Sequence, residues 1–182
     1  TISERIVGDG ELLRFQFWSD SGDFSHTIAL SAPDTVTAHF SMYYWLDVSS
    51  PYGSTFGEGW YPAGDSVFFG LERDFVSSGT SQHMFSGWLG SGSGSYTGDE
   101  QSNYVLLSEP TSEVARWDPR YYVSVSSDYG EVVGSGWFDD GASATARCSP
   151  DTIYQNSVHR KVFYKWTGSM SSSENPFTFV VN

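Results

Sequence analysis

Apolar and polar residues alternate along several short segments of this chain, and the alternation predicts β-strands. It is clear in 33–40, 121–126 and 177–181, and the segments 65–69 and 142–146 follow Gly64 and Gly141 as further strands. No segment keeps a 3.6-residue apolar period with capping residues, so we expect little helix. Short strands separated by Gly-rich turns predict an all-β fold.

A repeat of 77 residues organises these strands. Matching residues stand 77 positions apart in four pairs: Pro33 and Pro110, Tyr52 and Tyr129, Gly59 and Gly136, and Trp60 and Trp137. A Phe-x-x-Trp pair occurs three times, as Phe15–Trp18, Phe85–Trp88 and Phe163–Trp166. Repeats of such length are modules that are stacked or strung together. We therefore expect tandem small β-sandwich or β-grasp-like modules.

The repeat also predicts how the chain is divided. Residues 1–40 match the C-terminal half of a unit, residues 41–117 form one complete unit, and residues 118–182 form a unit that lacks its last strand. That last strand is the Pro-led one, which occurs earlier as 33–40 and 110–117.

The charge balance excludes several classes of partner. The chain has 9 Lys and Arg against 22 Asp and Glu, a formal net charge of −13. Such a surface repels nucleic-acid phosphates and anionic lipid. No apolar run approaches the roughly 20 residues that cross a bilayer, so we expect no membrane span. The composition is typical of a secreted protein, and we expect an extracellular location at the cell surface.

No motif predicts catalysis or a cofactor, and we expect the protein not to be an enzyme. The Gly-x-Gly at 57–59 lacks the third glycine and the helix of a phosphate-binding loop. The four histidines are scattered without zinc-ligand spacing, and no Gly-x-Ser-x-Gly elbow occurs. Asp139 and Asp140 are adjacent, so in a strand they point to opposite faces rather than form a glycosidase pair.

Calcium is the one ligand that the sequence keeps open. Asp20 and Asp23 lie in the Gly/Ser loop after Trp18, and Asp99 and Glu100 lie in the equivalent loop after Trp88. Clustered carboxylates in such loops can bind Ca²⁺ together with backbone carbonyls. A simple solvated loop is the other interpretation.

The single cysteine allows three interpretations, and the tryptophans allow two. Cys148 is either a buried small apolar residue, an exposed inert thiol, or the site of a disulfide between copies. Trp18, Trp88 and Trp166 recur at a fixed place, which favours a core anchor in each module. Exposed aromatic residues would instead offer a platform for stacking sugars.

Together these motifs carry a family resemblance. The segments 57–64 and 134–141 both have the pattern Gly-x-Gly-Trp-Tyr/Phe-x-x-Gly, followed by Phe-x-x-Trp and the Pro-led segment. This order resembles the tandem repeats of archaeal and bacterial cell-surface proteins, and it is similar to the divergent internalin-B-type bacterial repeat. The resemblance covers residues 15–182. Gly precedes Trp in the family, whereas Phe17 and Lys165 stand at that place here, so only 85–88 matches fully.

The resemblance implies small all-β modules that act as stalks, adhesion arms or parts of an S-layer, without catalytic residues. The acidic composition, rich in Tyr and Trp, leans towards an archaeal source.

The incomplete last unit suggests a mechanism of self-assembly. Residues 1–7 form an extended segment without a counterpart in the repeat. We expect this segment, or residues 33–40, to fill the incomplete unit of a second copy by strand addition. The candidate assembly residues are Thr1, Ile2, Ile6 and Val7 at one end, and Phe177, Phe179, Val181 and Cys148 at the other.

The predicted function is therefore a non-enzymatic structural subunit of a filament, sheath or surface layer, whose main partners are copies of itself. Two other interpretations remain open: the half-unit 1–40 packs within its own chain, or the protein is an adhesion module that binds polysaccharide or other surface proteins through exposed Tyr and Trp.

Overall fold

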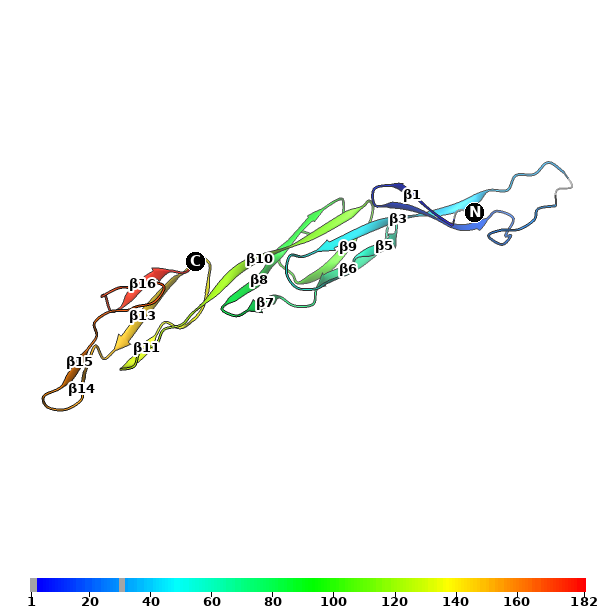
Figure 1. Cartoon of the computed structure of the whole chain (residues 1–182). Coiled ribbons are helices and arrows are strands. Elements are labelled where there is room, and N and C mark those ends of the chain that lie inside the picture. The colour runs from blue at the N-terminus through cyan, green and yellow to red at the C-terminus, as the bar shows by residue number, and fades with distance from the viewer. Residues whose placement is uncertain (1–2, 30–31) are drawn as a thin grey trace. The chain divides into compact units, whose positions relative to one another are not determined.

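The computed structural model describes residues 3–29 and 32–182, and every regular element in these residues is a β-strand (Figure 1). The prediction of an all-β fold is confirmed. The chain divides into two compact units. Unit 1 comprises Thr1–Asp74 and Phe85–Trp117, and unit 2 comprises Phe75–Met84 and Asp118–Asn182. The predicted borders after residues 40 and 117 remain a prediction about folding modules.

Unit 1 is built from two sheets. In the first, the strand order is β1 (Glu4–Gly8), β2 (Glu11–Trp18), β3 (Ala38–Ser49), the part of β10 (Thr111–Val123) up to Trp117 and the part of β8 (Ser81–Ser91) from Phe85, with β5 (Gly59–Pro62) paired to β3. In the second, the order is β4 (Thr55–Phe56), β6 (Ser66–Leu71) and β9 (Ser102–Leu106). The strand pairs with a given register are antiparallel, except β3 with β10, which is parallel. β8 lies next to β10 in the sheet order.

Unit 2 contains shorter ladders. The strand β7 (Phe75–Ser78) pairs with the start of β8, and β12 (Gly136–Asp139) pairs with the end of β10. A three-stranded sheet has the order β11 (Glu131–Val133), β13 (Ser143–Ser149) and β16 (Phe177–Val180), and β14 (Thr152–Tyr154) forms a hairpin with β15 (Arg160–Val162).

The core of unit 1 lies between its two sheets. Its fully enclosed side chains come from both: Leu46, Val48, Val67, Phe69, Leu71, Trp88, Val105, Leu107 and Ala115. Trp88 is 2 % exposed, its ring lies 5.0 Å from Phe69 and 5.6 Å from Phe85, and its indole N–H donates to the Gln101 carbonyl. The predicted role of Trp88 as a core anchor is confirmed, whereas Trp18 and Trp166 are only half-buried.

Backbone hydrogen bonds recur where the sequence repeats. The N–H groups of Phe15, Phe85 and Phe163 donate to the carbonyls of Ser3, Asp74 and Asp151, at 2.8, 2.8 and 2.7 Å. The segment from Ser3 into β1 therefore occupies the place of the strands β7 and β14. The expectation that residues 1–7 have no counterpart was wrong for the described part of that segment. The cause is that backbone geometry repeats here while the side chains do not.

The Gly-x-Gly turns are fixed by close backbone approach. Gly57 has φ +96°, and a Cβ there would lie 2.7 Å from the Cβ of Phe69. Gly134 has φ +115°, and a Cβ there would collide with the Thr145 carbonyl. Only glycine combines this φ with the absence of a side chain, so both turns press directly against the neighbouring strand.

Two predicted strands are shorter than expected, and the one predicted at 121–126 ends at Val123. The Pro-led segment 33–40 enters a strand only at Ala38, whereas its counterpart 110–117 is in β10 from Thr111 onwards. The difference is a matter of partners, because Thr111–Val114 has β3 beside it and 33–37 has no ladder partner among the described residues.

Candidate functional site

The Pro-led strand closes the core of unit 1. Residues Thr111 to Val114 pair in parallel with Leu46 to Ser49, so that Glu113 lies opposite Val48. The alternate residues Thr111, Glu113 and Ala115 point inwards and are buried. We call this four-residue ladder the lid, because its inward side chains complete the core of unit 1.

Glu113 is an unusual component of that lid. Its side chain is fully buried, its Oε1 accepts a hydrogen bond from the Tyr96 N–H at 2.7 Å, and its Oε2 has no partner in the described part of the chain. Burial raises the pKa of this carboxyl to about 7, although the Tyr96 hydrogen bond acts in the opposite direction.

Trp117 packs at the end of the same strand. Its ring lies 5.9 Å from those of Phe85 and Tyr52, and its indole N–H donates to the Ser50 Oγ at 3.0 Å. The counterparts of Phe85, Tyr52 and Ser50 in unit 2 are Phe163, Tyr129 and Ser127.

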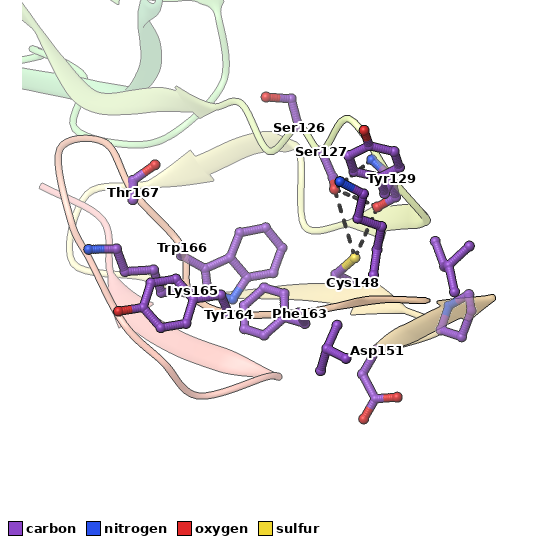
Figure 2. Close-up of a pocket in the computed structure, with 14 residues that line it drawn as sticks. Ser126, Ser127, Tyr129, Cys148, Asp151, Phe163, Tyr164, Lys165, Trp166 and Thr167 are labelled. Carbon is purple, nitrogen blue, oxygen red and sulfur yellow. Dashed lines mark hydrogen bonds between the residues drawn. The ribbon is translucent and has the colours of Figure 1, made fainter. Parts of the chain in front are cut away.

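In unit 1 the three residues pack around the Trp117 side chain, whereas in unit 2 their counterparts line a groove. The groove has a volume of about 410 Å³, and we call it the acceptor groove; its lining includes Ser126, Ser127, Tyr129, Cys148, Phe163, Lys165 and Trp166. Figure 2 shows Ser126, Ser127 and Tyr129 on one side and Phe163 to Thr167 on the other. The groove therefore lies where the repeat would place a Pro-led strand.

Both flanks of the groove have shortened strands. β3 continues to Ser49, but its counterpart in unit 2, β10, ends at Val123, which matches Leu46. β8 continues to Ser91, whereas β15 ends at Val162, just before Phe163. Both strands stop where a neighbour that could share their hydrogen bonds is lacking.

The backbone of the first flank offers free hydrogen-bonding groups. Val125 directs its N–H to the Ser135 Oγ at 2.9 Å. Successive residues of an extended chain direct their backbone groups to opposite edges, so Ser124 and Ser126 face the groove side. Among the described residues the N–H and C=O groups of Ser124 and Ser126 have no partner.

The loop with Asp20 and Asp23 is organised around a histidine. The Asp20 carboxylate accepts from His26 Nε2 at 2.7 Å and from the Gly22 N–H at 3.1 Å, and His26 Nδ1 lies 2.8 Å from the Asp23 carbonyl oxygen. The hydrogen bond with Asp20 raises the pKa of His26, and the same bond lowers the pKa of Asp20.

The second acidic loop, at Asp99 and Glu100, has fewer side-chain contacts than the first among the described residues. In the second loop, the Glu100 N–H donates to the Tyr96 hydroxyl at 3.3 Å. No cluster of three His, Cys, Asp or Glu that could hold a metal occurs in the part of the chain that the structure describes. Calcium binding stays a prediction.

The predicted assembly residues fall into different settings. Thr1 and Ile2 lie outside the described residues. Ile6 and Val7 are in β1, where their side chains are 71 % and 42 % exposed, and β1 is already paired with β2. Phe177 and Phe179 point inwards from β16, and Val181 and Cys148 are buried.

Their role in assembly stays a prediction, since none of the described ones except Cys148 lines the acceptor groove. The Cys148 Sγ lies 3.5 Å from the Tyr129 carbonyl oxygen.

Sequence reasoning did not select Ser124, Ser126 or Glu113. The sequence did contain a signal for Glu113. Its counterpart one repeat earlier is the apolar Val36, so a carboxyl group stands where the repeat has an apolar side chain.

An exposed aromatic ladder covers the outer face of the second sheet in unit 1. The ring of Phe68 lies 5.4 Å from that of Phe56 and 5.0 Å from that of Tyr104, and Phe68 and Tyr104 are 47 % and 61 % exposed. Unit 2 has Thr145 and Thr178 paired at the same ladder position.

In comparisons with protein-family models, curated proteins and solved structures, nothing matches this chain. The resemblance to cell-surface repeats therefore rests on the sequence motifs. The described residues include no helix that is long and apolar enough to span a membrane.

Proposed function

We propose that this chain is a non-enzymatic structural protein of the cell surface, located outside the cell, whose copies join head to tail by β-strand addition. The observation that supports this function is the acceptor groove of unit 2, beside which the backbone groups of Ser124 and Ser126 have no partner in residues 3–29 and 32–182. In unit 1 the same position is filled by Thr111 to Val114.

Strand addition suits a cohesive role. An added strand contributes main-chain hydrogen bonds along its whole length, and its alternate side chains enter the core. A head-to-tail contact that does not close into a ring builds a filament or a layer. The acceptor groove belongs to unit 2 and the Pro-led segment 33–37 to unit 1, so the contact is head to tail.

The test is whether the purified protein polymerises. Light scattering across a concentration series should give a mass that grows with concentration, and negative-stain electron microscopy should show filaments, sheaths or sheets. A protein that stays monomeric at every concentration, and forms no assembly in micrographs, would overturn the proposal.

A second function, carbohydrate binding in adhesion, is favoured by the aromatic ladder of Phe56, Phe68 and Tyr104. Exposed rings on a flat sheet face are suited to stacking on sugar rings, and this face is open to solvent.

Titration with polysaccharides, followed by Trp and Tyr fluorescence, tests this second function. The double variant Phe68→Ala/Tyr104→Ala should lose binding, whereas Thr145→Ala/Thr178→Ala, at the same ladder position of unit 2, should retain it. Equal binding by both variants would show that the ladder is not the site.

A further inference from the structure

We infer that the acceptor groove of unit 2 binds residues Asp34 to Thr37 of a second copy, as a parallel strand beside Val123 to Ser126. This inference rests on the proposed function and specifies its contact. Thr111 to Val114 of unit 1 supply the template, because 34–37 and 111–114 are the same positions of the repeat.

The template fixes the register. Glu113 lies opposite Val48 in unit 1, and subtracting or adding 77 places Val36 opposite Val125. In a parallel ladder the N–H and C=O of one residue bond to the two neighbours of the residue opposite. Val36 should therefore donate to the Ser124 carbonyl and accept from the Ser126 N–H.

The free backbone groups of both segments match this register. Thr37 donates its N–H to the Ser19 Oγ and accepts from the Ser19 N–H, both at 2.9 Å, so Val36 directs its groups to the opposite edge. Within residues 3–29 and 32–182, the N–H and C=O of Val36 have no partner. In the same described residues, the backbone N–H and C=O groups of Ser124 and Ser126 on the side that faces the groove have no partner. Each segment therefore offers the donor and the acceptor that the other segment lacks.

The side chains fit as well. Val36 takes the inward position that Glu113 occupies in unit 1, so the second copy brings an apolar group rather than a carboxylate to the core. The receiving wall consists of Val123 and Val125, which are only half-buried, whereas their counterparts Leu46 and Val48 are 0 % and 2 % exposed under the lid. Covering Val123 and Val125 removes apolar surface from water.

Charge favours the encounter. The chain has only two lysines, Lys161 and Lys165, and both line the acceptor groove of an otherwise acidic protein. The incoming segment carries Asp34 and is preceded in its own half-unit by the acidic loop at Asp20 and Asp23. Opposite charges at the two surfaces steer association, and added salt should slow it.

Cysteine cross-linking tests the register directly. In unit 1, Ser112 Oγ donates to Asp47 Oδ2 at 3.2 Å across the parallel ladder, which shows that outward side chains at this position touch. The corresponding pair between copies is Thr35 and Ser124. We would mix Thr35→Cys and Ser124→Cys, each in a Cys148→Ser background, under mild oxidation and read heterodimers on a non-reducing gel.

Two controls make the result specific. Ser126→Cys, two residues out of register on the same face, should give about tenfold less heterodimer, since mispairing forfeits about 1.4 kcal/mol or more. Adding Val36→Pro to the Thr35→Cys chain should abolish the cross-link, because proline removes the N–H that Ser124 accepts. Residue 36 lies outside the strands of the free chain, so the substitution leaves its ladders intact.

The outcomes separate the contact from the function. Register-selective heterodimers that Val36→Pro abolishes support the contact. If the wild-type chain polymerises but cross-linking is absent, unselective or insensitive to Val36→Pro, the contact is wrong and the assembly function stands. If neither polymers nor heterodimers form, both are wrong.

Discussion

Replacing Glu113 by glutamine removes an ionisable group from the core of unit 1 while keeping the shape of the side chain. The carboxyl is fully buried, one oxygen accepts from the Tyr96 N–H at 2.7 Å, and burial raises its pKa from 4.5 to about 7. Glutamine keeps an oxygen for Tyr96 and cannot ionise.

The sign of the effect follows from proton linkage. Between pH 4.5 and about pH 7 the folded chain retains the Glu113 proton and the unfolded chain releases it. The contribution of Glu113 to stability is therefore fully present below pH 4.5 and is lost as pH rises through about 7. At 1.36 kcal/mol per pH unit, the loss is roughly 3 kcal/mol.

Urea unfolding, followed by tryptophan fluorescence at about pH 4.5 and about pH 8, measures this loss. The free energy of unfolding of the wild type, relative to Glu113→Gln, should fall by roughly 3 kcal/mol between the two pH values. Both chains carry the same remaining carboxyls, so the contributions of those groups cancel. Glu58→Gln, at an exposed position, is the matched control and should show no such difference. A difference between wild type and Glu113→Gln that is the same at both pH values would refute the reasoning.

Three further predictions concern the core, a turn and the acidic loop. Phe69→Ala should lower the free energy of unfolding by about 3–5 kcal/mol, because its ring is fully buried, and a urea midpoint that does not move would contradict this. Gly57→Ala should destabilise more than Gly64→Ala in the same assay, since both have positive φ but only Gly57 is pressed against Phe69; equal losses would contradict the steric argument. Calcium in the loop at Asp20 has to displace His26, so calorimetric titration should show weaker binding at about pH 6 than at about pH 8; equal affinities, or no binding, would exclude this loop as the site.

Local patterns allowed several strands to be predicted from the sequence. The alternation at 142–146 extends through β13, where Ala144, Ala146 and Cys148 are buried and the residues between them are exposed. Phe177, Phe179 and Val181 likewise lie on one inward-facing side. Such predictions succeed because the two-residue period of a strand is written in consecutive residues.

Pairing between distant segments could not be predicted. The parallel ladder joins Leu46 to Thr111, 65 residues away, and no turn between them specifies the register. The Pro-led segment 33–37 has a strand pattern but no strand, since pattern alone does not supply a neighbour. The acceptor position at Ser124 and Ser126 was missed for the same reason: an open edge is a property of the assembled sheet.

The two units share backbone ladders but fill their cores from different strands. At one ladder position unit 1 pairs Phe69 with Asn103, and unit 2 pairs Ala146 with Phe177. The large ring lies on the central strand in unit 1 and on the edge strand in unit 2, so the residue identities are exchanged across the ladder. Because core residues can trade places in this way, they diverge between copies of the repeat. Glycines at 57 and 134 cannot be compensated by a neighbour, because each turn lies directly against the adjacent strand, and this is why both copies of the repeat keep them.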